Sequence, residues 1–236
     1  MRLDFTSDRV LAVVAHPDDA ELLCAGTLAR ARSDGAVVGI CVLCKGDKGQ
    51  PAEPVPNLAA VRRREATAAA KLLGAELYWC GFPDGELADG PRQRRALLRR
   101  VRAFAPTLIL AHAAEDYHPD HRAAAALADA VSWFAASRGH ASREPRLPTP
   151  PSVWEGDTIG MSHFLPGFFV DISGHVDIKH RMLRCHATQL RRGGDDDFAP
   201  LEVLMRRQYT TRGEQSGAAA AEAFRIHHAF KRARAW

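Results

Sequence analysis

The sequence predicts an α/β fold in which a mostly parallel sheet carries helices on both faces. Three observations lead to this prediction. Short apolar runs alternate along the chain with longer segments of helical periodicity. The apolar runs contain few polar residues, which is typical of parallel strands that are covered on both sides. The 236 residues are 46% hydrophobic and 25% charged, which suits one globular domain covering residues 1–236.

Two strand–helix units are expected in the first third of the chain. The apolar run VLAVVA (10–15) is predicted to be the first strand, and residues 20–33 are predicted to form the helix that follows it. The next apolar run, VVGICVLC (37–44), is the second strand. Residues 57–74 have helical periodicity, and this helix is expected to stop at Gly74 because glycine commonly ends helices.

Two further units follow in the middle of the chain. ELYWCG (76–81) is predicted to be a strand, and Pro91 opens a helix that runs to about Phe104, since proline suits the first helical turn. The apolar run TLILAH (107–112) is predicted to be the next strand. An Ala-rich helix is expected over residues 119–137.

The last part of the chain is less regular. The Pro-rich stretch EPRLPTPPSV (144–153) is predicted to be a loop within the same domain. FFVDIS (168–173) is expected to be one more strand, residues 175–190 a helix, and residues 199–211 the last helix. The basic tail HHAFKRARAW has no predicted element.

The charge balance and the lack of long apolar runs exclude several classes of protein. Lys and Arg number 32 and Asp and Glu 28, and the resulting net charge of +4 is too mild to indicate a nucleic-acid-binding protein. No apolar run approaches the roughly 20 residues that a membrane span needs. The start, MRLDFTSDRV, lacks the apolar stretch of a signal peptide. We therefore expect a cytoplasmic protein that binds neither nucleic acid nor a membrane.

The five cysteines are expected to be free. An odd number in a chain of this size argues against a disulfide framework. Cys41 and Cys44 form a CxxC motif, but both lie in a predicted strand, where residues three apart point to opposite faces. This geometry disfavours chelation or cross-linking by the pair. The small buried residues expected here are Cys24, Cys41, Cys44, Cys80 and Cys185.

Two related motifs come directly after predicted strands. HPDD (16–19) follows the first strand, and HPDH (118–121) follows the strand at 107–112. In open α/β sheets, ligands bind at the carboxyl ends of the strands. Each motif by itself is explained equally well by helix capping, because proline suits the first helical position and aspartates near it complement the helix dipole. Two histidine–carboxylate clusters at one edge of a sheet, however, indicate a metal site.

The spacing within the motifs suggests which side chains would bind the metal. His16 and Asp19 are three residues apart across a strand-to-helix turn and can face one point, and His118 and His121 can share a helix face. Ligation by His16, Asp19 and His121 would leave the open position that is typical of catalytic zinc. Asp18 and His118 then remain for acid–base work.

Two more carboxylates lie beside these histidines in the sequence. Asp116 or Asp120 is expected to orient a histidine ring through its second nitrogen, as carboxylates commonly do around metal sites. An exposed loop or helix carboxylate is an equally good explanation for each of them.

The segment GDKG (46–49) follows the second predicted strand. It lacks the spacing of a phosphate-binding P-loop. We therefore expect it to be a turn, with a pocket role for Asp47 or Lys48.

Together these motifs resemble those of the PIG-L/LmbE-like family of metal-dependent N-deacetylases. The resemblance rests on AHPDDAE, followed by GTLA, and on HPDH, and this pair of motifs at this separation is specific. Weaker matches keep the family's order over nearly the whole chain. They are Arg62 and Glu65 in VRRREATAAAKLLG, FPDG (82–85), VDIS (170–173) and AEAF (221–224).

The resemblance implies a Rossmann-like, LmbE-like deacetylase fold and a role for each site residue. The family residues that match His16, Asp19 and His121 bind zinc, and ferrous iron is the alternative metal. Asp18 matches the general base of the family. His118 matches the histidine that supports the oxyanion and the departing amine.

The implied function is removal of an N-acetyl group from a small soluble N-acetylglucosaminyl compound similar to GlcNAc-malate. Arg62 matches a substrate-binding arginine of the bacillithiol- and mycothiol-pathway branch of the family. The partner is then an acetylated amino sugar, and the relatives in this branch imply a homo-oligomer. The loop at 144–167 is expected to form a pocket wall or a subunit contact.

Three alternatives to this function stay open. The first is hydrolysis of an amide in another acetylated metabolite or in a chitooligosaccharide. The second is a non-catalytic sugar-binding relative. The third is a nucleic-acid-binding domain that uses the arginine runs at 92–102 and 231–235, which lack interleaved aromatic residues for stacking.

Overall fold

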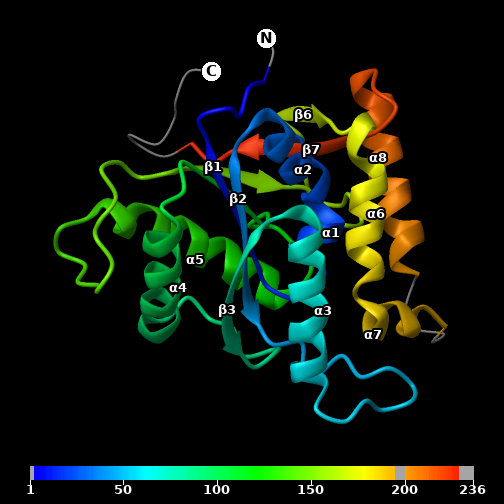
Figure 1. Cartoon of the computed structure of the whole chain (residues 1–236), viewed down its shortest axis with the longest axis horizontal. Coiled ribbons are helices and arrows are strands. Elements are labelled where there is room, and N and C mark those ends of the chain that lie inside the picture. Colours follow the sequence, from blue (N-terminus) through cyan, green and yellow to red (C-terminus); the bar gives the residue numbers. More distant parts are fainter. Residues whose placement is uncertain (1–2, 195–199, 229–236) are drawn as a thin grey trace.

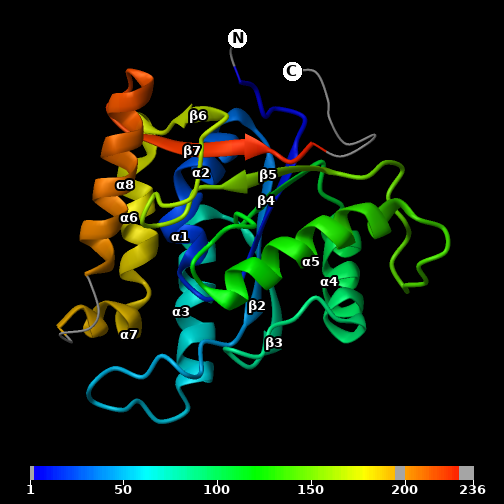
Figure 2. The same ribbon diagram turned by 180° about the vertical axis from the view of Figure 1, so that it is seen from behind.

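A seven-stranded sheet forms the centre of the molecule, and helices cover both of its faces (Figure 1, Figure 2). The structure is a computed structural model and describes residues 3–194 and 200–228. The strands are β1 (Arg9–Val14), β2 (Val37–Cys44), β3 (Glu76–Phe82), β4 (Leu108–Ala111), β5 (Ser152–Gly156), β6 (Phe168–Asp171) and β7 (Ala221–Ile226). The α-helices are α1 (Asp19–Leu23), α2 (Ala25–Asp34), α3 (Leu58–Leu73), α4 (Pro91–Phe104), α5 (Pro119–Ala136), α6 (Val176–Arg184), α7 (Ala187–Leu190) and α8 (Leu201–Ser216). Two short 3₁₀ turns are η1 (Ser173–His175) and η2 (Arg191–Gly194).

The strand order confirms the predicted fold class. The order in the sheet is β3-β2-β1-β4-β5-β7-β6. β1 pairs in parallel with β2 and β4, while β3 and β5 extend the parallel sheet on either side. β7 lies between β5 and β6 and runs antiparallel to both. The sheet is therefore mostly parallel, with one antiparallel strand.

The two faces of the sheet have separate helical layers. Helices α4 and α5 cover one face, and α1, α2, α3, α6 and α8 cover the other (Figure 1, Figure 2). Val10 and Ala12 of β1 point into the core beneath the larger layer, whereas Leu11 and Val13 point into the core beneath α4 and α5. Because both faces are covered, β1 is buried on both sides, which explains its continuous apolar run.

Two strands lie where the sequence predicts none. β5 begins at Ser152, inside the stretch predicted to be a loop. β7 contains Glu222, which is buried because Lys179 and the backbone N–H groups of Gly26 and Thr27 surround its carboxylate. A buried carboxylate in a six-residue strand hides the apolar pattern, so only these tertiary contacts reveal β7.

Two predicted helices are divided in the structure. Cys24 leaves the helical conformation with φ −146°, so the helix expected over 20–33 becomes α1 and α2. The helix expected over 175–190 becomes η1, α6 and α7. None of the helices in the described ranges has both the length and the apolar character to cross a membrane. Residues 229–236 of the basic tail lie outside the described residues.

The cysteines follow the prediction only in part. All five are free, but Cys80 and Cys185 are partly exposed. Cys41 and Cys44 both pack in the core beneath α4 and α5, so the prediction that they point to opposite faces is wrong. The pairing of β2 with β3 shifts register between Val42 and Cys44, and this irregularity interrupts the alternation of side chains.

The centre of the sheet positions the candidate site. β1 and β4 lie side by side and in parallel, so the two His-Pro-Asp motifs that follow them meet at the same edge. The loops after β2 and β3 reach the same edge, because these strands are the next two parallel neighbours of β1. This edge is the place where open α/β sheets bind their ligands.

Candidate active site

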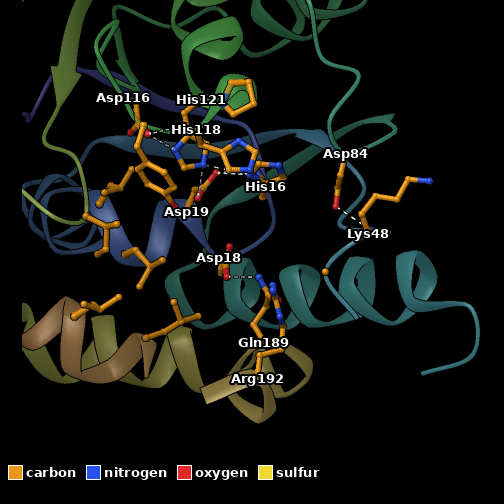
Figure 3. Close-up of a pocket in the computed structure, with 18 of the residues that line it drawn as sticks. His16, Asp18, Asp19, Lys48, Asp84, Asp116, His118, His121, Gln189 and Arg192 are labelled. Carbon is orange, nitrogen blue, oxygen red and sulfur yellow. Dashed lines mark hydrogen bonds and ion pairs between the residues drawn. The ribbon is translucent and has the colours of Figure 1, made fainter. Parts of the chain in front are cut away.

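The three side chains predicted to bind a metal come together at the carboxyl ends of β1 and β4 (Figure 3). Nδ1 of His16 lies 3.3 Å from Nε2 of His121. The Asp19 carboxylate approaches both rings, with Oδ2 at 3.5 Å from His16 Nδ1 and Oδ1 at 3.4 Å from His121 Nε2. Nitrogen and oxygen donors from two distant motifs thus gather around one point, and we call His16, Asp19 and His121, the predicted metal ligands, the metal-facing cluster.

The turn after β1 separates the two adjacent aspartates of the HPDD motif. Asp18 has a left-handed backbone with φ 101°, an uncommon conformation for a residue with a side chain. α1 begins immediately afterwards at Asp19, whose Oδ2 accepts a hydrogen bond from the backbone N–H of His16 over 2.7 Å. The two carboxylates therefore point in different directions, as the sequence predicts.

Asp116 and Asp120 each hold one of the two metal-facing histidines. Asp120 Oδ2 lies 3.0 Å from His16 Nε2, and Asp116 Oδ1 lies 3.0 Å from His121 Nδ1. The Asp116 contact is an ion pair and not a well-aligned hydrogen bond. Both carboxylates are buried, which excludes the explanation that they are exposed surface charges. With these outer nitrogens occupied, His16 Nδ1 and His121 Nε2 present their lone pairs to the shared point.

The donor set fits a tetrahedral metal ion. Zinc–nitrogen bonds of about 2.0–2.1 Å in a tetrahedral site place two ligand atoms about 3.3–3.4 Å apart. Nδ1 of His16 and Nε2 of His121 lie 3.3 Å apart, and each lies near one oxygen of the Asp19 carboxylate, Oδ2 at 3.5 Å for His16 and Oδ1 at 3.4 Å for His121. Two imidazoles and one carboxylate are also ligands that zinc and ferrous iron accept.

The surrounding carboxylates raise the pKa values of His16 and His121. Burial lowers the pKa of His16, but Asp120 and Asp19 more than offset this effect and raise it to about 10. Burial also lowers the pKa of His121, which Asp19 and Asp116 raise to about 9. A cation bound by the same nitrogens would replace these protons.

Asp18 lies beside the metal-facing cluster and is 5% exposed. Its Oδ2 accepts a hydrogen bond from Nε2 of Gln189 over 2.7 Å. Burial, and next the charge of Asp19, raise the pKa of Asp18 to about 6, against the opposing influence of His186, Gln189 and Arg62. A carboxylate in this range can accept a proton and return it near neutral pH.

His118 caps the N-terminus of α5 and also faces the cavity. Its Nδ1 accepts a hydrogen bond from the backbone N–H of Asp120 over 3.1 Å, so the proton of the neutral ring resides on Nε2. Burial and the nearby His16 lower the pKa of His118. Nitrogen atoms of His16, His118 and His121 lie within 4.8 Å of one another, which places the His118 ring next to the metal-facing point.

His112 belongs to the same cluster and was missed in the sequence. It follows β4 directly, is buried, and stacks on His121 with ring centroids 4.1 Å apart. Its Nε2 accepts a hydrogen bond from the backbone N–H of Ala15 over 3.0 Å and lies 3.3 Å from Asp19 Oδ2. Since the N–H of Ala15 occupies that lone pair, Nε2 is not available to a metal, and the His112 ring packs against His121 and Asp19. Its place at the carboxyl end of a predicted strand was the signal that could have identified it.

These residues line a cavity of about 680 Å³ that has two different walls. Lys48, Asp84 and Arg192 form a charged wall on one side of the metal-facing cluster (Figure 3). Apolar side chains make up much of the remaining lining, and they are Leu22, Leu23, Ile159, Leu201 and Leu204. Arg62 also lines the cavity but is only 2% exposed, because its guanidinium is bound by Gly49 and Gln189.

Known proteins share both the sequence pattern and the fold. Residues 11–132, which are 122 of the 236 residues and contain both His-Pro-Asp motifs, match the PIG-L family model, described as GlcNAc-PI de-N-acetylase. The conserved protein TT1542 from Thermus thermophilus is 32% identical with a TM-score of 0.79, and the match covers 97% of this chain and 100% of that one. The N,N'-diacetylchitobiose deacetylase of Pyrococcus horikoshii is 26% identical with a TM-score of 0.81, over 94% of this chain and 85% of its own.

Relatives of this chain are not all deacetylases. The 4-oxalmesaconate hydratase of Pseudomonas putida is 27% identical over 188 residues, which are 76% of this chain and 73% of the hydratase. The family model nevertheless spans more than half of the chain, including the strands and motifs that build the cluster. From the match and the site together, the chain belongs to the PIG-L family of metal-dependent de-N-acetylases.

Proposed function

We propose that this protein removes the acetyl group from a small N-acetylglucosaminyl compound similar to GlcNAc-malate. His16, Asp19 and His121 would hold zinc, with ferrous iron as the alternative metal. The observation that carries the proposal is that the imidazole nitrogens of His16 and His121 lie 3.3 Å apart and that each lies within 3.5 Å of an oxygen of the Asp19 carboxylate. Asp18 and His118 line the same cavity. Three protein ligands leave a fourth position for water or substrate.

Each residue beside the metal-facing point has a chemical role in amide hydrolysis. A bound divalent cation supplies Lewis acidity, which acidifies water and polarises the acetyl oxygen. Asp18 accepts the proton of the water as its oxygen bonds to the acetyl carbon. The Nε2–H of His118 donates a hydrogen bond to the carbonyl oxygen as negative charge develops on it. The proton held by Asp18 then passes to the sugar nitrogen, the C–N bond breaks, and acetate and a free amine leave.

Two cations in the charged wall of the cavity favour a substrate that carries an anionic group. Lys48 and Arg192 line the cavity on the side away from the apolar residues. A carboxylate next to the sugar, as in GlcNAc-malate, would pair with these cations. The resemblance assigns a substrate contact to Arg62, which lines the same cavity.

Short chitooligosaccharides are the second substrate class. The diacetylchitobiose deacetylase of Thermococcus kodakarensis is 28% identical to this chain over 226 residues, which are 92% of this chain and 82% of the relative. A neutral disaccharide would fill the cavity without forming an ion pair with Lys48 or Arg192. Comparison of anionic and neutral acetylated sugars therefore separates the two candidates.

The test is acetate release from a panel that includes GlcNAc-malate and N,N'-diacetylchitobiose. Metal-free, zinc-loaded and iron-loaded protein would be compared with the Asp18→Asn variant. We expect release that requires metal, is greatest for GlcNAc-malate, and falls by about 10²–10⁴-fold in Asp18→Asn, because the general base is lost. Metal-dependent release that survives in Asp18→Asn would overturn the role of Asp18. No release from any substrate, with one metal bound per chain, would overturn the proposed activity.

A further inference from the structure

Asp18, Gln189 and Arg62 are buried polar side chains connected by hydrogen bonds, and this line of residues runs away from the metal-facing cluster. Gln189 of α7 is the middle residue in this line, and its Nε2 donates to Asp18 Oδ2 over 2.7 Å (Figure 3). Its Oε1 accepts hydrogen bonds from Nη2 of Arg62 and, over 3.4 Å, from Nη1 of Arg192. Gln189 is 6% exposed and Arg62 is 2% exposed, so the line is shielded from water.

The chemistry of the three groups determines how the Gln189 amide is oriented. A guanidinium can only donate hydrogen bonds, and an ionised carboxylate can only accept them. The Gln189 amide has an oxygen that accepts hydrogen bonds and an NH₂ group that donates them. Its oxygen must therefore face Arg62, and its NH₂ group must face Asp18. Arg62, together with Arg192, thereby determines that a donor, and not an acceptor, points at Asp18.

The GDKG loop after β2 makes room for Arg62. Gly46 has φ +69°, and a Cβ atom at this position would lie 2.5 Å from Cδ of Arg62. A Cβ at Gly49 would lie 3.1 Å from each terminal nitrogen of the same guanidinium. The carbonyl of Gly49 also accepts a hydrogen bond from Arg62 Nη2. The glycines of this loop therefore let Arg62 reach Gln189.

α3 also binds α7, the helix that carries Gln189. α7 is only four residues long, too short to be stable by its own hydrogen bonds. Glu65, one turn along α3 from Arg62, accepts hydrogen bonds from the backbone N–H of Thr188 over 2.9 Å and from its hydroxyl over 2.6 Å. Arg62 and Glu65 thus bind consecutive residues of α7 and set the direction of the Gln189 side chain.

We propose that Gln189 is a positioning residue that holds the Asp18 carboxylate in line for proton transfer. Arg62 acts on Asp18 through Gln189, a role separate from its proposed contact with substrate. The inference rests on the proposed function, since it takes Asp18 as the base. Asp18 contacts the reacting water in that function, whereas Gln189 acts only by restricting where the carboxylate lies. A misplacement of about 1 Å in such a group can cost about 10²-fold in rate.

The test measures kcat and KM for acetate release in zinc-loaded Gln189→Leu and Gln189→Glu. Glu at this position keeps an oxygen for Arg62 but removes the N–H that reaches Asp18, so it separates packing from hydrogen bonding. We expect kcat to fall by about 10- to 100-fold in both variants. The amount of bound metal should stay near the wild-type value in both variants, since no predicted ligand changes. KM should stay near the wild-type value in Gln189→Glu, which keeps an oxygen to hold Arg62.

The matched control is Gln208→Leu. Gln208 is 4% exposed and donates one hydrogen bond, over 2.8 Å, to the carbonyl of Thr158. It should keep the wild-type kcat, because it does not contact Asp18. If Gln189→Glu retains the wild-type kcat, or if either Gln189 variant raises KM alone, the positioning role is overturned.

A double-mutant cycle connects Gln189 to Asp18 directly. If Gln189 works only through Asp18, adding Gln189→Leu to Asp18→Asn should lower kcat no further. Additive losses would place the effect of Gln189 elsewhere and overturn the proposal. Wild-type activity in Asp18→Asn would instead show that the proposed base is wrong, which is a failure of the proposed function and is visible before the cycle is completed.

Arg62→Met tests whether Arg62 acts on Asp18 through Gln189. Its kcat should fall as in Gln189→Leu, and any rise in KM measures the separate contact with substrate. Arg102→Met is the matched control, since Arg102 is 5% exposed and its guanidinium donates to the backbone carbonyls of Phe134, Ala135 and Ser137. A wild-type kcat in Arg62→Met would overturn the assigned role of Arg62.

Discussion

Asp120 joins His16 to the loop after β3. Its Oδ2 lies 3.0 Å from Nε2 of His16 and accepts the backbone N–H of Gly85 over 2.7 Å, and its Oδ1 accepts that of Leu87 over 3.3 Å. Gly85 is the last residue of the FPDG segment, which the sequence indicated only through resemblance. One buried carboxylate therefore fixes both the orientation of a candidate metal ligand and the position of a loop that lines the cavity.

Replacement of Asp120 by Asn should weaken metal binding. The amide oxygen of Asn can still accept from Gly85 and His16, but its NH₂ group then faces the N–H of Leu87, and the negative charge that favours a proton on His16 Nε2 is lost. We expect metal affinity to fall by about 10- to 100-fold, as found for other carboxylates behind ligating histidines. Competition with a chromophoric chelator measures this affinity. Asp89→Asn, which removes a carboxylate paired with Arg94 at the surface, is the control and should bind metal as the wild type does. Equal affinity in both variants would show that Asp120 only anchors the loop.

His118→Asn should separate catalysis from helix capping. The His118 side chain accepts the N–H of Asp120 at the start of α5, and Asn is a good residue for that position. The variant should keep its Tm, whereas His118→Ala should lose about 1 kcal/mol, or about 2–4 °C in Tm. Both variants should lose about 10²–10³-fold in kcat, because neither supplies a donor where the imidazole stood. Full activity in His118→Asn would remove His118 from the mechanism.

Removal of the metal should lower thermal stability. A ligand that binds only the folded state stabilises it, by about 2.7 kcal/mol at a concentration 100 times its Kd. Zinc added to chelator-treated protein should therefore raise Tm, as followed by differential scanning calorimetry. The Asp19→Asn variant replaces a charged carboxylate by a neutral amide, which is a weaker ligand, and should show a much smaller rise. A rise of the same size in Asp19→Asn would mean that zinc binds elsewhere.

Lys179→Met should destabilise the fold. Lys179 Nζ lies 2.6 Å from Oε1 of Glu222, and both side chains are buried. Removing one partner leaves a buried charge without its counterion and should cost about 3–5 kcal/mol in the free energy of unfolding. The Lys179→Met/Glu222→Gln double variant should recover part of this loss, because no charge is then left unpaired. Urea unfolding measures both, and a double variant that is no better than the single one would contradict this explanation.

The order of the elements could be predicted because it depends on local patterns. Continuous apolar runs indicated β1, β2 and β4, since strands covered on both faces have no polar side. Pro91 and Pro119 marked the start of α4 and α5 correctly, because proline suits the first helical turn. The pattern failed at β7, where Glu222 is buried only because residues from other elements surround its carboxylate.

The sequence by itself determined that two His-Pro-Asp motifs follow parallel strands. It predicted that three side chains in them bind a metal and that two more serve acid–base chemistry. Only the tertiary structure decided which carboxylate serves which histidine, Asp120 for His16 and Asp116 for His121. It also decided that His112 packs against the candidate ligand His121 and that Gln189 reaches Asp18 across 171 residues of chain. The reason is physical: spacing along one element sets which side chains share a face, but contacts between elements depend on sheet register and helix packing. No local pattern contains that information.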